Sequence, residues 1–178
     1  MKLTLACISN KVLIILILFF PSLIIAQNNS IKEELVSYPT YYFGDPNPLP
    51  AFIFNPKIYP YHKFQGYDFE KADKEIKIIT LENEWIIVQV FPEAGGKVWS
   101  AVDKGNGNEF IYKNDVAKFR NIAMRGPWTS GGIEFNFGVI GHHPGTATPV
   151  DYRLDELADG SVMCTVGGID LPSRTQWR

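Results

Sequence analysis

Short segments of β-type sequence follow one another from residue 74 to residue 166, and this pattern most constrains the fold. Residues 74–80 alternate in polarity, with Ile76 and Ile78 on one face. Residues 84–91 are apolar on both faces, which is typical of a strand that is covered on both sides, as in one layer of a sandwich. The expected strands are residues 74–80, 84–91, 97–102, 109–113, 133–139 and 161–166.

Glycine-containing turns separate these segments. Residues 92–96 read Pro-Glu-Ala-Gly-Gly and turn the chain, while Gly-Asn-Gly-Asn at 105–108 is a strong hairpin signal. Asp-Gly at 159–160 precedes the last expected strand. The sequence shows no amphipathic helix after residue 37 and no internal repeat, so we expect an all-β chain.

Residues 27–75 have a different composition, rich in proline, tyrosine and phenylalanine. Six prolines fall between residues 39 and 60, and such spacing excludes long helices and central strands. We expect an irregular, extended arm that lies across one face of a domain formed by residues 76–178. The alternative is that its aromatic rings form a platform on which sugars stack.

The N-terminus has the order of a secretory signal peptide. Lys2 and Lys11 precede the apolar run 12–25, and Ala26 offers a small residue for cleavage before a polar stretch. The run is shorter than the ~20 residues that a membrane-spanning helix needs. We expect cleavage after residue 26 and export to the periplasm or the cell exterior; an uncleaved anchor is the alternative, because Ile24 is bulky for its place before the cleavage point.

Charge and cysteine content exclude several classes of partner. Cleavage removes two of the 17 Lys and Arg residues and none of the 19 Asp and Glu residues, which leaves a net charge of about −4. A mildly acidic chain has no electrostatic footprint for nucleic acid or an anionic membrane. Cys164 is then the single cysteine, so neither an internal disulfide nor a cysteine zinc site is possible. Since Cys164 lies in an expected strand, we expect a core thiol.

The stretch 125–144, RGPWTSGGIEFNFGVIGHHP, holds the candidate site. If residues 133–139 form a strand, Glu134 and Asn136 share the face opposite four apolar side chains. Neighbouring glycines leave room around these two polar groups for a ligand or another backbone. The candidate site residues are Arg125, Trp128, Glu134, Asn136, His142 and His143.

These residue types suit the recognition of a polyhydroxylated ring. An indole stacks on the apolar face of a sugar, while guanidinium, amide and carboxylate groups satisfy its hydroxyls. Glu134 and His142 could exchange protons near neutral pH, so we take them as the catalytic candidates. The alternative is that Glu134 is a structural carboxylate paired with Arg125 or Arg120, and that both histidines are loop residues.

Metal and cofactor chemistry has no matching motif. Two adjacent histidines cannot easily bind one metal ion from the same strand face, and the chain lacks a thiol pair. Phosphate-cradling glycine loops, nucleophile elbows and His-Glu-x-x-His motifs are absent from the sequence. We expect a site without metal or cofactor.

Two stretches resemble known families. Residues 81–112, LENEWIIVQVFPEAGGKVWSAVDKGNGNEFIY, resemble the opening strands of the galactose mutarotase-like superfamily. Residues 118–152 are similar to a bacterial domain of unknown function that is typically exported and often followed by tetratricopeptide repeats. The resemblance implies an antiparallel β-supersandwich with a concave face that binds carbohydrate.

The mutarotase resemblance also implies a catalytic pair that is incomplete here. In that superfamily a histidine protonates the ring oxygen, and a glutamate from late in the chain acts as the base. No residue matches the late glutamate, since the sequence stops at Gln176-Trp177-Arg178 in an apparent strand, and no residue securely matches the histidine. We therefore expect an N-terminal fragment of a larger sandwich, inactive by itself.

Two functional hypotheses follow. One is an exported carbohydrate-binding domain that performs acid–base chemistry on a sugar ring or glycosidic bond. A hydrolase would need a second carboxylate, for which Asp151 and Asp155 are nearby candidates in the sequence. The other is a non-catalytic scaffold domain that holds a glycan or a protein.

Overall fold

The computed structural model describes residues 28–44, 67–121, 127–136, 143–170 and 173–178. The predicted signal peptide and the proline-rich part of the arm at 45–66 lie outside these ranges. Within them, no helix has the length and apolar character that crossing a membrane requires.

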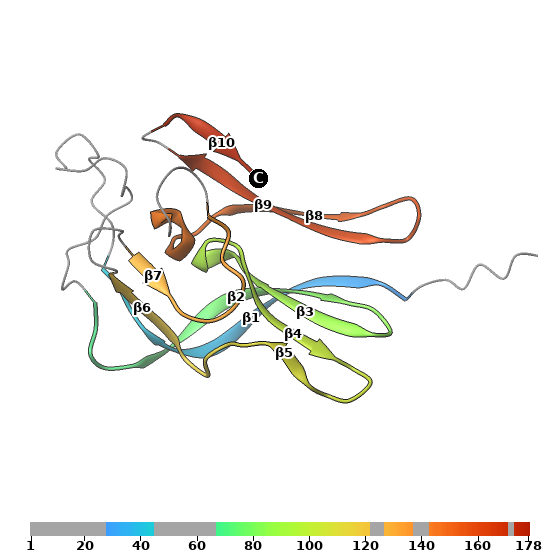
Figure 1. Cartoon of the computed structure of the whole chain (residues 1–178), viewed down its shortest axis with the longest axis horizontal. Coiled ribbons are helices and arrows are strands. Elements are labelled where there is room, and N and C mark those ends of the chain that lie inside the picture. Colours follow the sequence, from blue (N-terminus) through green and yellow to red (C-terminus); the bar gives the residue numbers. More distant parts are fainter. Residues whose placement is uncertain (1–27, 45–66, 122–126, 137–142, 171–172) are drawn as a thin grey trace, which may run out of the picture.

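The described part of the chain is built from two β-sheets (Figure 1). The larger sheet has seven strands in the order β5-β4-β3-β2-β1-β6-β7, and it curls strongly. Its strands are β1 (Ser30–Tyr41), β2 (Ala72–Glu82), β3 (Ile86–Phe91), β4 (Lys97–Asp103), β5 (Glu109–Ile111), β6 (Ala117–Asn121) and β7 (Pro127–Thr129). Neighbours pair antiparallel except β1 and β6, which are parallel.

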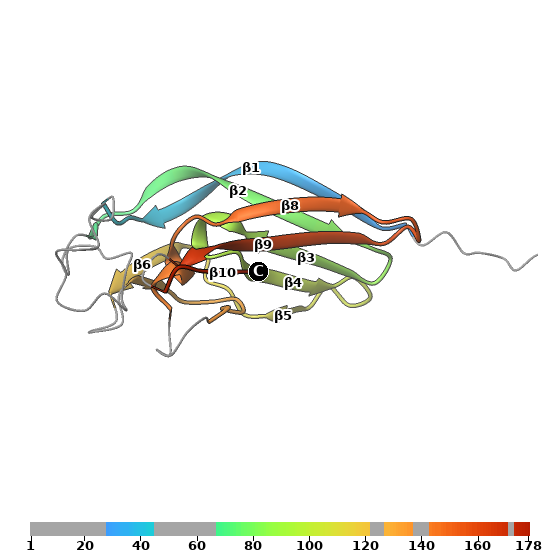
Figure 2. The same cartoon turned by 90° about the horizontal axis from the view of Figure 1, so that it is seen from above.

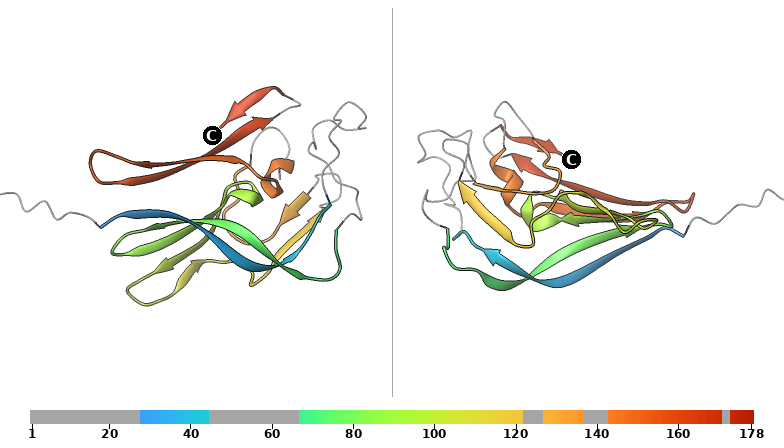
Figure 3. Two further views of the ribbon diagram at one scale, coloured as in Figure 1. Left: turned by 180° about the vertical axis from the view of Figure 1, so that it is seen from behind. Right: turned by 60° about the horizontal axis from the view of Figure 1, so that its bottom comes forward.

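The smaller sheet has the order β10-β9-β8 and is antiparallel. It comprises β8 (Asp151–Glu156), β9 (Val162–Asp170) and β10 (Thr175–Trp177). Seen from above, β8 and β9 run along the strands of the larger sheet (Figure 2), and the β2–β3 and β8–β9 hairpins extend toward the same end of the molecule (Figure 3). This all-β, sandwich-like arrangement confirms the expected fold class.

Residues 30–41 depart from the expected irregular arm. They form β1, which pairs with β2 along all but its last residue, from Ser30 opposite Glu82 to Thr40 opposite Ala72. The prediction failed because most β1 side chains are exposed, so the strand depends on backbone pairing and leaves no apolar pattern. Pro39 is tolerated because β6 pairs only with the last two residues of β1, which leaves the edge beside Pro39 unpaired.

Two 3₁₀ turns join the sheets. These are η3 (Pro92–Ala94) and η5 (Pro144–Ala147). Gly95 donates its backbone N–H to the carbonyl of Thr148 at 2.8 Å, and Val150 donates to the carbonyl of Pro92 at 3.1 Å. A Cβ atom on Gly95 would lie 2.5 Å from the Thr146 Cα, so only glycine permits this approach.

The core lies beneath this junction. Trp99 is its largest fully buried side chain, and its ring meets Phe91 edge-on, with centroids 5.4 Å apart. Ile76 and Ile78 bury the face of β2 that the sequence predicted. Phe119 from β6 and Ala147 from η5 complete the cluster from the other elements. The core thus forms where the curled sheet closes on η5.

The strands expected between residues 74 and 113 are confirmed as β2 to β5, with the hairpin turn at 105–108 between β4 and β5. The strand expected at 161–166 is confirmed as part of β9. We expected residues 84–91 to be buried on both faces of the strand. Only Val90 and Phe91 are buried, whereas residues 86–88 are half-buried and Trp85 is exposed.

The strand expected at 133–139 is wrong for its described part. Residues 133–136 make only an isolated bridge between Ile133 and Val98. Ile133 and Phe135, expected to be buried, are 45% and 42% exposed, whereas Glu134 is half-buried. Gly131 and Gly132 both have positive φ angles, and this left-handed turn redirects the chain before a ladder can form.

Gly132 gives a test of this close packing. A Cβ atom there would lie 2.4 Å from the Val98 carbonyl oxygen, whereas at Gly107, which has the same φ of 73°, it would meet nothing within 4 Å. We expect Gly107→Ala to cost about 1–2 kcal/mol from backbone strain alone, and Gly132→Ala to cost about 1–3 kcal/mol more from the clash. Urea unfolding of both variants measures the difference; equal losses would contradict this account.

Candidate functional site

The structure describes four of the six candidate residues from the sequence. Trp128 lies in β7, Glu134 and Asn136 follow the Gly131–Gly132 turn, and His143 precedes η5. Arg125 and His142 lie outside the described residues. Among the four, a hydrogen bond joins Asn136 to His143, since the Asn136 side-chain oxygen accepts the His143 backbone N–H at 2.8 Å.

A buried lysine supports the turn that precedes Glu134. The ammonium of Lys97, which is 1% exposed, donates to the carbonyls of Thr129 at 2.7 Å and Gly131 at 3.1 Å. It also lies 6.0 Å from the centroid of the Trp99 ring. Lys97 therefore links β4 to the backbone that positions Glu134.

Burial lowers the pKa of Lys97 to about 8, because a low-dielectric site disfavours the charged ammonium. The negative charge of Glu134 acts in the opposite direction and raises the pKa. Lys97 is thus a cationic neighbour of Glu134 that the sequence analysis did not identify. The Arg120 guanidinium, one expected partner of Glu134, lies 4.3 Å from the centroid of the Tyr67 ring.

Both ring nitrogens of His143 have partners. Nδ1 accepts the backbone N–H of Gly145 at 3.0 Å, which caps η5. Nε2 lies 3.2 Å from Oδ1 of Asp170, at the end of β9. An Nδ1 that accepts must be unprotonated, so this geometry fits the neutral tautomer with hydrogen on Nε2. His143 thus ties η5 to the smaller sheet.

Asp170 is held as a carboxylate. Burial by itself raises its pKa, but hydrogen bonds from Ser173 and His143 outweigh burial and hold the pKa below the usual value. The Ser173 backbone N–H donates to Oδ2 at 2.9 Å. The His143–Asp170 pair is therefore a fixed polar wall.

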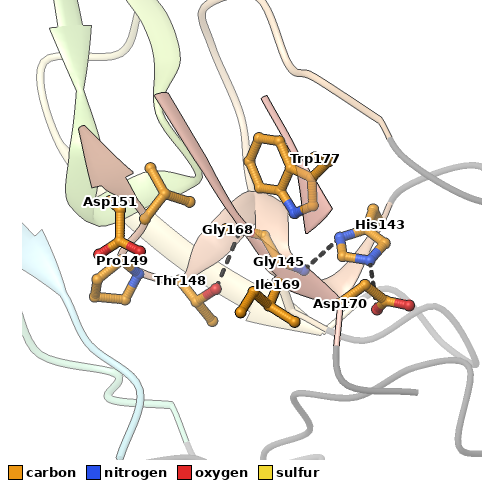
Figure 4. A pocket seen from close by; sticks show the side chains of 10 residues that line it. His143, Gly145, Thr148, Pro149, Asp151, Gly168, Ile169, Asp170 and Trp177 are labelled. Atoms are coloured by element: carbon orange, nitrogen blue, oxygen red, sulfur yellow. Dashed lines mark hydrogen bonds and ion pairs between the residues drawn. The ribbon is translucent and has the colours of Figure 1, made fainter. Parts of the chain in front are cut away.

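A cavity of about 290 Å³ opens against this wall (Figure 4). Its polar groups come from His143, Asp170, Thr148 and Asp151, while Trp177 supplies an indole ring. Figure 4 shows the indole near the His143 imidazole, with Asp151 at the other end of the view. The cavity thus brings together residues from η5, β8, β9 and β10 and the segments that flank them.

Gly167 in β9 makes room for the backbone of Trp177. A Cβ atom on Gly167 would lie 2.5 Å from the Trp177 carbonyl oxygen, so β10 can pair here only beside glycine. On Gly168, a Cβ atom would lie 3.6 Å from the indole nitrogen, an ordinary van der Waals distance. Gly167 therefore permits the close approach of β10, and the indole packs beside Gly168.

Sequence reasoning gave His143 as a candidate binding residue but did not assign a role to Trp177 or Asp170. It named Asp151 without a basis for choosing it over Asp155, whose carboxylate accepts from Arg153 at 2.8 Å. The glycines at 167 and 168 could have indicated that another strand approaches β9 closely there. The sequence does not reveal that this neighbour is β10, which carries Trp177. Among the described residues, no group of three His, Cys, Asp or Glu side chains is arranged to hold a metal ion.

Comparison with known families agrees with the second resemblance. A family model described as "Domain of unknown function (DUF5107)" matches residues 54–178. The chain belongs to this family. The match includes the core strands β2 to β5 and every residue that lines the cavity.

A solved structure is similar to this DUF5107 member. It is the crystal structure of a TPR-domain containing protein from Parabacteroides distasonis ATCC 8503, with 31% sequence identity and a TM-score of 0.67. The similarity covers 78% of this chain and 24% of that one. The chain thus matches about a quarter of a longer protein that contains TPR repeats.

The lowered pKa of Lys97 should make the free energy of unfolding of this DUF5107 member depend on pH. Its folded pKa of about 8 lies below the ordinary 10.5, so the unfolded chain binds more protons between these values. Stability from this group should therefore rise as the pH increases from about 8 to 10.5, by up to about 3 kcal/mol. We expect Lys97→Met to remove this rise.

Urea unfolding of the parent and Lys97→Met chains at several pH values measures this difference. Lys104→Met, at an exposed ion pair with Glu82, is the matched control and should retain the rise. An identical pH slope in the parent and Lys97→Met chains would contradict the assignment.

Proposed function

We propose that this chain is an exported carbohydrate-binding domain. The observation that carries the proposal is the cavity in which the Trp177 indole lies with His143, Asp170, Thr148 and Asp151. An indole offers an apolar surface to the C–H face of a pyranose, and carboxylates and hydroxyls satisfy its hydroxyl groups. A fixed wall around such groups lowers the entropy cost of binding.

Binding suits the described geometry better than acid–base catalysis by His143. Both of its ring nitrogens already have protein partners, so a proton transfer would break a contact that joins the sheets. Glu134, Trp128 and Asn136 do not line the cavity, although Asn136 positions His143. Glu134 and His142 remain the catalytic candidates of the chain, with His142 outside the described residues. Glu134→Gln tests the role of the carboxylate: normal glycan processing by this variant would exclude it.

The finer relationship to the galactose mutarotase-like superfamily is part of the proposal. Its support is the path of residues 81–112, which form the expected strand, glycine turn and hairpin. A scaffold role is the second candidate function. It is favoured by the similar crystal structure, which is of a TPR-domain containing protein.

Export rests on the N-terminal sequence, with cleavage proposed after Ala26. Expression of the full chain in a bacterium, followed by N-terminal sequencing of the periplasmic protein, tests this. We expect a mature chain that begins at Gln27. A chain retained in the membrane fraction with Met1 at its N-terminus would instead indicate an uncleaved anchor.

Sugar binding predicts a selective effect of removing the Trp177 indole. We expect Trp177→Ala to weaken binding of a neutral sugar about 5- to 30-fold, equivalent to about 1–2 kcal/mol of lost stacking and buried area. Trp85→Ala is the matched control, because Trp85 is 65% exposed and does not line the cavity, so its loss should change affinity less than twofold.

Calorimetric titration with glucose, galactose, cellobiose, maltose and β-1,4-galactobiose measures this effect, after circular dichroism has shown that each variant is folded. If none of these sugars binds, or if both tryptophan variants lose affinity equally, the proposed site is wrong.

A further inference from the structure

The charged groups that line the cavity beside Trp177 are acidic. Asp170 and Asp151 contribute carboxylates, whereas His143 is neutral because its Nδ1 accepts the backbone N–H of Gly145. Among the described residues, no lysine or arginine lines this cavity. The cavity therefore offers negative charge and an aromatic ring, without a cationic side chain to offset the charge.

Strand register separates the Asp170 carboxylate from the nearby arginines. In β9, positions 168 and 170 share one face, and they pair with Trp177 and Thr175 of β10. The indole and the Asp170 carboxylate thus lie on the same face of the smaller sheet. Arg153 and Arg178 lie beside positions 165 and 167, which belong to the opposite face.

The negative charge of Asp170 is not cancelled by its neighbours. The Ser173 backbone N–H donates to Oδ2 at 2.9 Å, and Nε2 of the neutral His143 lies 3.2 Å from Oδ1. Both partners are uncharged, so the carboxylate keeps its full charge. Each carboxylate oxygen also has a second acceptor position beyond the contact that it makes here.

An ammonium group suits this combination better than a hydroxyl group does. It donates up to three hydrogen bonds and carries the charge opposite to that of Asp170, and such charge-assisted bonds are stronger than neutral ones. A cation near an indole is also attracted to the face of the ring. Figure 4 shows Trp177 and Asp170 both beside His143, so one sugar ring could contact the indole and the acid together.

We propose that the cavity binds a cationic amino sugar, a hexosamine with a free amine, and that Asp170 receives its ammonium group. This inference rests on the proposed carbohydrate-binding function and narrows its ligand. A neutral sugar keeps the contact with the indole but lacks the ion pair, and a uronic acid brings a second negative charge toward Asp170. Affinity should therefore fall from amino sugar to neutral sugar to uronic acid.

Calorimetric titration of the full chain with matched sugars tests this order. One series is glucosamine, glucose, N-acetylglucosamine and glucuronate; the other is galactosamine, galactose, N-acetylgalactosamine and galacturonate. At pH 6 the free amines are protonated, since such an amine has a pKa near the ~8 of an α-amino group. In at least one series we expect the amino sugar to bind 10-fold or more tightly than its neutral parent and its N-acetyl form. Equal or weaker binding of the amino sugar in both series would overturn the inference.

Two single substitutions assign the preference to Asp170. Asp170→Asn removes the charge at nearly constant shape and should reduce the preference for the amino sugar at least fivefold. Asp155→Asn is the matched control, because Asp155 lies on the opposite face beside Arg153 and does not line the cavity; this variant should retain the preference. Circular dichroism checks that both variants fold, and the two ligand series on the parent chain stay decisive if Asp170→Asn does not. A preference that is unchanged in Asp170→Asn, or that both variants lose equally, would also overturn the inference.

The outcomes distinguish this inference from the function on which it rests. Sugar binding that depends on Trp177, without any preference for the amine, would leave the carbohydrate-binding function standing and remove the assignment of an amino sugar. Absence of binding by every sugar of both series would remove both.

Discussion

The approach of two loops at Gly95 is the contact on which the rest of this structure depends. There the turn after β3 meets the backbone of Thr146 at a distance that excludes any Cβ atom, and two backbone hydrogen bonds join the turn to the segment that leads into β8. Backbone contacts of this kind fix position more tightly than apolar packing, because hydrogen bonds are directional. The smaller sheet consequently has a defined place over the larger one.

The proposed binding cavity follows from that placement. His143 caps η5 and contacts Asp170, so one imidazole links the loop junction to the end of β9. Gly167 then allows β10 to approach the same strand closely, which places the Trp177 indole beside Gly168. The polar groups and the indole thus meet because η5 is attached to β9 through His143 and β10 pairs with β9.

The buried Lys97 ammonium loses its hydration but holds the backbone of the Thr129–Gly131 turn in position. Its ammonium is removed from water, which lowers its pKa, yet it supplies hydrogen bonds to two carbonyls of the Thr129–Gly131 turn. Without those bonds the carbonyl groups would lose partners in a largely buried region. The residue that follows this turn by three places is Glu134, so the proposed acid–base candidate depends on a lysine from β4.

The sequence by itself determined the local β structure of residues 72–111 and the turns at Gly95 and Gly107, because alternation and glycine act over a few residues. It also singled out His143. Only the tertiary structure decided that residues 30–41 are a strand, since exposed side chains leave no pattern and the stabilising bonds come from β2. The same holds for Trp177 beside His143, because strand neighbours, not sequence neighbours, bring these side chains together.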